Sequence, residues 1–337
     1  MAPREIGTGE VGITSSVPIE VVYAAGARVV DLNNVFIESA SNWSLVDAAE
    51  RRGFPESSCA WIKGIYSAAK TRGTEVVIAV TQGDCSNTHA LMEVLETEGV
   101  ETVPFMYPFD RDRRLLALQI EKLCERFGVS MAEAEAARER LQGVRAKIAE
   151  IDRLTWEEGR VGGFDNHYYQ ICCSDMKGDP AAFEREVDSF LASARDAEPR
   201  QADLRLAYIG IPPIVSGIYS LVEGCGGTVV FNELQRQFSM PGRAAGLVDQ
   251  YLAYTYPYHI RARLADIKTE IKRRGVDGII HYVQAFCFRQ IEDMIVRKEI
   301  DLPVLTLECN RPGKVDLRSN VRIEAFLDLV RARKRKR

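Results

Sequence analysis

Short uninterrupted runs of apolar residues alternate with amphipathic stretches along most of the chain. The uninterrupted runs are rich in β-branched residues and have the length of buried strands. Strands are predicted on this basis at 29–32, 76–80, 101–104, 204–211, 228–231, 278–283 and 303–308. Helices are predicted, from apolar residues at helical spacing, at 88–97, 214–223, 262–274 and 321–333. Parallel sheets with helices on both faces have this alternation.

Residues 110–159 depart from this alternation, because their pattern is helical throughout. Ser130 and Glu133 have the spacing of a capping box, and apolar residues then recur at alternating spacings of three and four up to Ile151. This pattern predicts an antiparallel helical hairpin or insertion, with a partner-binding coiled coil as the alternative. The glycine-rich stretch 159–163 follows and predicts a domain boundary.

The fold class expected from these patterns is α/β, with two Rossmann-like (flavodoxin-like) parallel-sheet domains and a helical insertion between them. A chain of 337 residues is long enough for two such domains. The expected parts are an N-terminal α/β domain at 1–110, a helical insertion or hairpin at 111–160, and a C-terminal α/β domain at 161–337.

Composition and charge argue against several classes of protein. Lys and Arg number 44 and Asp and Glu 48, for a net charge of −4, whereas nucleic-acid binders are strongly basic. Apolar runs are too short for a membrane span, and residues 1–10 lack the apolar core of a secretory signal. No P-loop occurs, and the pattern G-x-G-x-x-G occurs once, at 7–12, without a predicted strand ahead of it. We therefore expect a cytoplasmic protein with no nucleic-acid or membrane partner and no ATP hydrolysis of its own.

Eight cysteines are the most informative feature of the composition. No two of them have the C-x-x-C spacing, which argues against zinc knuckles, thioredoxin motifs and the bacterial ferredoxin run. If metal is bound, thiolates from distant positions must come together. Three cysteines stand just ahead of predicted helices, where thiolates are favoured: Cys59, Cys85 and Cys287.

Two of these three cysteines follow predicted strands by a few residues, which places Cys85 and Cys287 at the carboxyl edge of a sheet. Together with Cys59 they would meet in the interdomain cleft, and three thiolates would leave one corner of a 4Fe-4S cluster open for water or substrate. The alternative is that each is a small buried apolar side chain, as free cysteines usually are.

Several segments together resemble one known family. The opening GITSSVPIEVVYAAGARVVDLNN, Cys59 in SSCAWIKG, Cys85 in QGDCSNTHALMEVLE, Cys287 in HYVQAFCFRQIEDM and the closing RIEAFLDLV are similar to the 2-hydroxyacyl-CoA dehydratase D-component family. That family also includes benzoyl-CoA reductase subunits and double-cubane cluster proteins. The resemblance extends from about Gly12 to Val330. One departure is Glu308-Cys309-Asn310, where the family usually has an acidic residue after the last strand.

The resemblance implies an iron–sulfur component to which a separate ATP-hydrolysing iron–sulfur activator protein delivers electrons at low potential. Cys59, Cys85 and Cys287 would ligate the cluster, and the substrate would be an acyl-CoA or another small molecule. The reduced cluster would pass an electron to the thioester carbonyl, and the resulting ketyl radical would expel the β-positioned hydroxyl. An iron at the open corner would act as a Lewis acid on oxygen. The reaction would be of the dehydratase (lyase) type. A homodimer is expected from the two-fold symmetry usual among soluble oligomers, with a heterodimer as the alternative, since dehydratases of this family normally combine two unlike subunits.

Ser15, Ser16 and Glu20 lie in the segment that resembles the family's substrate-side motif, which implies a catalytic role in orienting the substrate oxygen. Their alternative is structural, with Ser16 or Pro18 near a helix cap and Glu20 in the first turn. The tyrosines at 251, 254, 256 and 258 are expected either to line a substrate cleft or dimer interface, or to pack between helix and loop.

Two further functions stay open. One is a double-cubane (8Fe-9S) reductase of small molecules that does not use CoA esters. It would need more thiols, which the remaining cysteines could supply: Cys124, Cys172, Cys173, Cys225 and Cys309. The other is a non-catalytic electron carrier, cluster scaffold or partner subunit. Iron content per chain separates one cubane from two, and activity with an activator separates enzyme from carrier.

Overall fold

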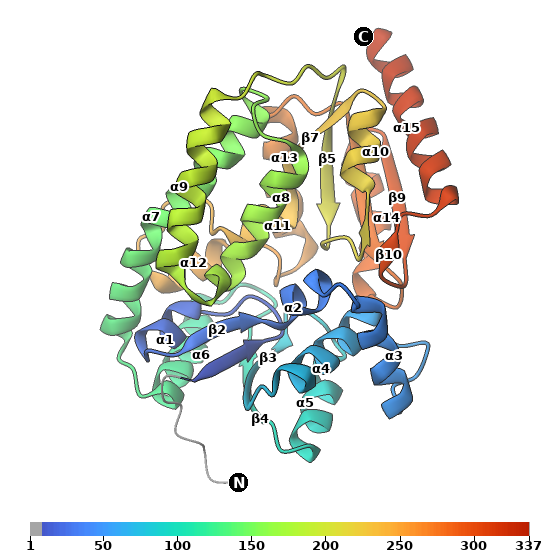
Figure 1. Cartoon of the computed structure of the whole chain (residues 1–337). Helices are drawn as coiled ribbons and strands as arrows, with labels where there is room; N and C mark the ends of the chain where they lie inside the picture. Colours follow the sequence, from blue (N-terminus) through green and yellow to red (C-terminus); the bar gives the residue numbers. More distant parts are fainter. Residues whose placement is uncertain (1–8, 337) are drawn as a thin grey trace. The chain divides into compact units, whose positions relative to one another are not determined.

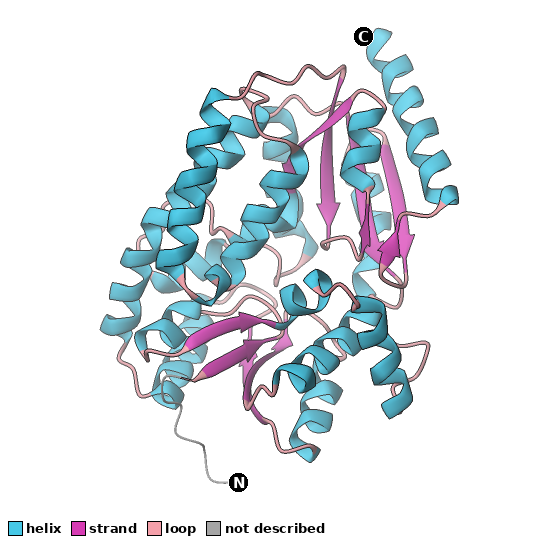
Figure 2. Cartoon of the chain, in the orientation of Figure 1, coloured by secondary structure: helices cyan, strands magenta, loops and turns pink. Residues whose placement is uncertain are grey.

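The structure is a computed structural model that describes residues 9–336 and contains two compact units (Figures 1 and 2). Unit 1 comprises Met1–Ala146, Cys172–Arg185 and Met240–His259, and unit 2 comprises Lys147–Ile171, Glu186–Ser239 and Ile260–Arg337. Most of the opening segment interpreted above as not being a secretory signal lies outside the described residues.

Unit 1 is built on a four-stranded sheet in the order β2-β1-β3-β4. All of its strands are parallel. The strands are β1 (Glu10–Ile13), β2 (Arg28–Asp31), β3 (Val76–Gln82) and β4 (Glu101–Met106). The connecting helices are α1 (Ile19–Ala24), α2 (Leu32–Glu38), α3 (Asn42–Arg52), α4 (Ala60–Arg72), α5 (Thr88–Thr97) and α6 (Arg113–Phe127). Because the strand order reverses direction at β1, right-handed crossovers put α1 on one face and α4 with α5 on the other.

Two later segments complete unit 1. The first carries the short 3₁₀ turns η1 (Cys172–Ser174) and η2 (Met176–Gly178), and the second carries α12 (Leu247–Ala253). The division between the units falls within two long helices, α7 (Met131–Trp156) and α9 (Pro180–Asp196).

Unit 2 repeats the strand order of unit 1 in a parallel sheet arranged β7-β5-β8-β9. The strands are β5 (Leu204–Gly210), β7 (Gly227–Asn232), β8 (Gly278–Gln284) and β9 (Val304–Cys309), with a separate pair β6 (Val215–Ser216) and β10 (Gly313–Lys314). The helical segments are α8 (Gly163–Ile171), α10 (Ile218–Gly224), α11 (Glu233–Phe238), α13 (Ile260–Arg273), η3 (Phe288–Glu292), α14 (Asp293–Glu299) and α15 (Leu317–Arg335). Apolar residues of β5, β7, β8 and α13 form its core.

The predicted α/β class with two parallel sheets is confirmed, and each predicted strand is present within a residue or two. The helix predicted at 214–223 is wrong at its start, because β6 occupies Val215–Ser216 and Gly217 then turns the chain with φ 99°. The compact units also divide the chain differently from the expected parts 1–110, 111–160 and 161–337. Helix α6 and most of α7 belong to unit 1, to which 172–185 and 240–259 also return.

None of the helices within residues 9–336 combines the length and the apolar composition that crossing a bilayer requires.

Candidate functional site

In each unit, one cysteine that was predicted to ligate the cluster lies on a turn at the carboxyl edge of the sheet. Strand β3 ends at Gln82 with Cys85 three residues later, and β8 ends at Gln284 with Cys287 three residues later. Both strands neighbour the first strand of their sheet, β1 or β5, where the strand order reverses. Such a switch point is where open α/β sheets bind ligands. Both thiols are half-buried.

The third predicted cysteine caps a helix. Cys59 is the N-cap residue of α4 and is 5% exposed. Because α4 ends at Arg72, just before β3 begins at Val76, its N-terminus lies toward the carboxyl edge where Cys85 is found. Cys287 is likewise the N-cap residue of η3. The placement of all three ahead of helical segments therefore agrees with the sequence pattern.

Cys59 and Cys85 belong to unit 1 and Cys287 belongs to unit 2. Within residues 9–336, no three histidine, cysteine, aspartate or glutamate side chains form a group that could hold a metal ion. Cluster ligation by the three thiols therefore stays a prediction.

Ser15 and Ser16, the serines with a predicted catalytic role, lie on the loop after β1, at the same switch point as Cys85. Thr14 anchors this loop to β3, since its amide donates to the Ile78 carbonyl (3.2 Å) and its hydroxyl accepts from the Val80 amide (3.0 Å). Ser15 is half-buried and Ser16 is buried. The Ser16 hydroxyl has no hydrogen-bond partner although it is fully enclosed. It is therefore an uncommitted polar group at this edge.

Glu20 has a different environment, because its carboxylate is fully buried and fully bonded. It receives hydrogen bonds from Arg145 (2.7 Å) and from the Gln250 amide (2.8 Å), and the Tyr251 hydroxyl lies 2.7 Å from its second oxygen. These contacts tie α1 to α7 and α12. Glu20 also lies in the first turn of α1, and Pro18 is the N-cap residue. These are the positions expected if the two residues have a structural role. A catalytic role for Glu20 stays a prediction.

The tyrosine-rich segment at 251–258 is packing within unit 1, since all four of its tyrosines are at most 4% exposed. The Tyr251 hydroxyl lies 2.7 Å from the Val17 carbonyl and accepts from the Ile19 amide (3.3 Å). Pro257 lies against the Cys85 turn, where a Cβ on Gly83 would come within 2.7 Å of the Pro257 carbonyl oxygen. The segment therefore holds the serine loop and covers the Cys85 turn.

A buried aspartate pair at the end of β2 was missed by the sequence patterns. The Asp175 carboxylate accepts from the backbone amides of Asp31 and Lys177, at 2.9 Å each. Burial and the neighbouring Asp31 carboxylate raise the pKa of Asp175 to about 7. No local sequence signal marks this pair, because its partners are 144 residues apart.

The five remaining cysteines differ sharply in environment. Burial raises the pKa of Cys124 to about 11 and that of Cys173 to about 12, and it raises the pKa of Cys172 still further. Burial thus favours the neutral form of all three thiols. Cys225 follows α10 directly before β7, at the amino-terminal edge of the sheet of unit 2. Cys309 ends β9, opposite Gln284.

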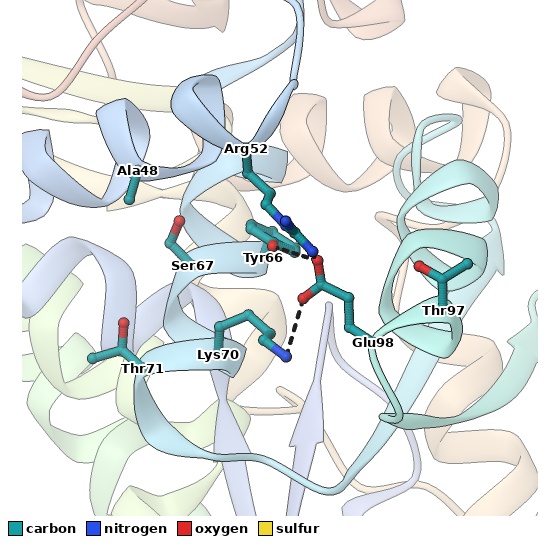
Figure 3. Close-up of a pocket in the computed structure, with 8 residues that line it drawn as sticks. All are labelled: Ala48, Arg52, Tyr66, Ser67, Lys70, Thr71, Thr97 and Glu98. Atoms are coloured by element: carbon teal, nitrogen blue, oxygen red, sulfur yellow. Dashed lines mark hydrogen bonds and ion pairs between the residues drawn. The ribbon is translucent and has the colours of Figure 1, made fainter.

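A hollow of about 540 Å³ in unit 1 lies away from these thiols (Figure 3). Its lining includes Arg52, Lys70 and Glu98, at the C-terminal ends of α3, α4 and α5. Arg52, Lys70 and the Tyr66 hydroxyl all bond the Glu98 carboxylate, at 2.9, 3.0 and 2.9 Å. Burial would raise the pKa of Glu98, but these bonds outweigh it and lower the pKa to about 2. The hollow is thus lined by two cations that share one carboxylate.

One family model matches residues 14–330, and its description is the D-component of 2-hydroxyglutaryl-CoA dehydratase. The matched region runs from the residue after β1 to within α15, and it includes every cysteine of the chain. A search among curated proteins finds no match. On the extent of the family match, this chain belongs to the 2-hydroxyglutaryl-CoA dehydratase D-component family.

Proposed function

We propose that this chain is the iron–sulfur component of an ATP-activator-dependent, low-potential system of the 2-hydroxyacyl-CoA dehydratase type. Cys59, Cys85 and Cys287 would ligate one 4Fe-4S cluster. The observation that carries the proposal is the repeated turn, because both sheets place a half-buried thiol three residues beyond a strand-ending glutamine at the switch point. Family membership supports a dehydratase component.

The three thiols suit an iron–sulfur cluster in kind and in surroundings. Iron–sulfur clusters are held by cysteine thiolates, and each of these cysteines precedes a helical segment whose free amide groups favour a thiolate. Phe286, just before Cys287, has φ 65°, a strained conformation of the kind that clusters at functional sites. When bound, such a cluster would take up and release one electron at low potential.

The residues around these thiols would position the substrate and limit water. The enclosed Ser16 hydroxyl is available to bond a substrate oxygen at the edge that carries Cys85. Glu20, through Arg145 and Tyr251, would keep the serine loop in place. Phe286 and Phe288, half-exposed on either side of Cys287, would lower the local dielectric constant.

The remaining parts of the proposal concern partners. The sequence contains no phosphate-binding loop, so the electrons would come from a separate ATP-hydrolysing iron–sulfur activator protein. The acceptor would be an acyl-CoA or another small molecule. The chain would act as a homodimer, the commonest symmetry among soluble oligomers.

One observation favours a second candidate, an electron carrier without substrate chemistry of its own. The Glu20 carboxylate is committed to Arg145, Gln250 and Tyr251, which leaves fewer groups free to act on a substrate. The double-cubane alternative is weaker, because two of the additional thiols lie away from the carboxyl edges: Cys124 in the last turn of α6, and Cys225 just before β7.

Anaerobic purification with iron and sulfide measured per chain, followed by EPR after reduction, tests the proposal. About four irons per chain are expected in the wild type, with most of the iron lost in Cys59→Ser, Cys85→Ser and Cys287→Ser. Cys225→Ser, at the opposite edge of unit 2, is the matched control and should keep its iron. Two results would contradict the proposal: a wild type that binds no iron, or an unchanged iron content in the variant in which all three cysteines are replaced. Dehydration of a 2-hydroxyacyl-CoA with an activator then separates enzyme from carrier.

A further inference from the structure

Helix α15 lies along the outside of unit 2 and has an apolar residue at every fourth position of its outer face (Figure 1). Its inner face packs on the sheet, since a Cβ on Gly278 of β8 would meet Val330 at 2.8 Å and Phe326 at 3.1 Å. The exposed apolar residues are named the α15 ridge: Leu317 (78% exposed), Val321 (56%), Ala325 and Leu329 (56%). The ridge takes no part in the core of unit 2 and is available to another molecule.

Charged side chains line both sides of the α15 ridge, with one sign on each side. On a helix surface, rows of residues three apart cross the rows of residues four apart. Arg318 and Glu324 stand three positions before and after Val321, so they flank it on opposite sides. The next ridge residue is flanked in the same way by Arg322 and Asp328, and all four charged residues are exposed. One side of the ridge is therefore basic and the other acidic.

This charge pattern is complementary to itself. A two-fold rotation about the direction of the ridge places two ridges side by side and exchanges their flanks. Arg318 then lies opposite the partner's Glu324, and Arg322 lies opposite the partner's Asp328. A two-fold axis across the ridge would instead bring Arg318 opposite the partner's Arg322. Charge therefore selects the first arrangement, in which rows of residues four apart pack together as in the commonest class of helix contact.

The two flanking pairs differ in what they already bond. Arg322 donates to the Thr306 carbonyl (2.6 Å), and Asp328 accepts from Arg331 (2.8 Å). Within residues 9–336, neither Arg318 nor Glu324 takes part in an ion pair. Arg318 and Glu324 are therefore the residues whose charges best report on a second copy.

We propose that the α15 ridge is the surface through which two copies of this chain form a dimer, with the basic side of each ridge against the acidic side of the other. This inference rests on the homodimer of the proposed function and deepens it by naming the surface. A single pair of helices buries less than the about 1,600 Å² of a standard interface, so the dimer is reversible, with a dissociation constant in the micromolar range.

Analytical ultracentrifugation of charge variants over a range of concentrations tests this surface. Arg318→Glu and Glu324→Arg each place like charges opposite one another, and we expect each to raise the dissociation constant of the dimer about tenfold. The double variant Arg318→Glu/Glu324→Arg restores opposite charges and should dimerise like the wild type. An equimolar mixture of the two single variants should do the same, because each chain then meets the opposite charges. Lys298→Glu, an equal charge change at an exposed position of α14, is the matched control and should have no effect.

The other results would overturn the inference in different ways. If both single variants dimerise as tightly as the wild type, the surface is wrong while the homodimer and the cluster of the proposed function stand. If the wild type stays monomeric at high micromolar concentration, the homodimer and this inference fail together, while the iron content still tests the cluster. Circular-dichroism melting shows whether each variant folds. If a single variant does not fold, the double variant decides, and a dimer weaker than that of the wild type overturns the inference.

Discussion

The Cys85 turn in unit 1 and the Cys287 turn in unit 2 share one plan but differ in how they are held. Each follows a seven-residue strand that ends in glutamine, and each reaches its cysteine three residues later. In unit 1 the left-handed position is Gly83 (φ 104°), enclosed by Pro257 and Tyr107. In unit 2 the left-handed position is Phe286 (φ 65°), which is 50% exposed.

This difference shows that the same strand and turn can hold a cysteine in two ways, with a closely packed turn or with a strained backbone. The Cys85 turn is fixed by neighbours that leave no room for a side chain at Gly83. The Cys287 turn instead keeps a strained backbone and the exposed apolar side chains Phe286, Phe288 and Met294.

The largest expected effect concerns the buried carboxylate that supports the first turn. Glu20→Ala leaves Arg145 buried without its ion pair, so we expect the free energy of unfolding to fall by about 3–5 kcal/mol. The control is Glu10→Ala, which removes a part-exposed pair with Arg72 and should cost less than about 1 kcal/mol. Urea denaturation at neutral pH measures both. Equal losses in the two variants would mean that Glu20 does not anchor the serine loop.

The next effect tests the packing of the Cys85 turn directly. Gly83→Ala adds a Cβ that would lie 2.7 Å from the Pro257 carbonyl oxygen, in a conformation that alanine avoids. We expect a loss of about 2–4 kcal/mol from overpacking and backbone strain together. Gly99→Ala, with φ 81° and open space around it, isolates the backbone share and should cost about 1–2 kcal/mol. If the two variants lose the same stability, the Cys85 turn is not closely packed.

Local pattern was enough to predict most of the fold. Buried parallel strands are uninterrupted apolar runs, so β3 and β8 were visible as 76–80 and 278–283. The position of Cys85 and Cys287 at a carboxyl edge followed from the strand that precedes each of them. These features depend on neighbouring residues, which is why a single sequence reveals them.

The supports of the site could not be predicted, because they join residues far apart in the chain. Arg145 bonds Glu20 across 125 positions, and Tyr107 bonds the Ser16 carbonyl across 91. Residues 240–259 return to unit 1 from within the sequence of unit 2, which no periodicity signals. The environment of Cys309 likewise depends on the pairing of β9 with β8.

The smallest effect concerns the strain in the Cys287 turn. Phe286→Gly relieves a left-handed backbone worth about 1–2 kcal/mol, but it also makes the unfolded chain more flexible by about 0.5–1 kcal/mol. Because Phe286 is half-buried, the variant also loses about 1 kcal/mol of apolar burial, and we expect a net change close to zero. Phe288→Gly is the matched control, since Phe288 is similarly exposed but helical, and it should destabilise by about 2 kcal/mol. A clearly smaller loss in Phe286→Gly than in Phe288→Gly, measured by thermal melting, would establish that the Cys287 turn is held under strain, whereas equal losses would mean that packing fixes this turn, as it fixes the Cys85 turn.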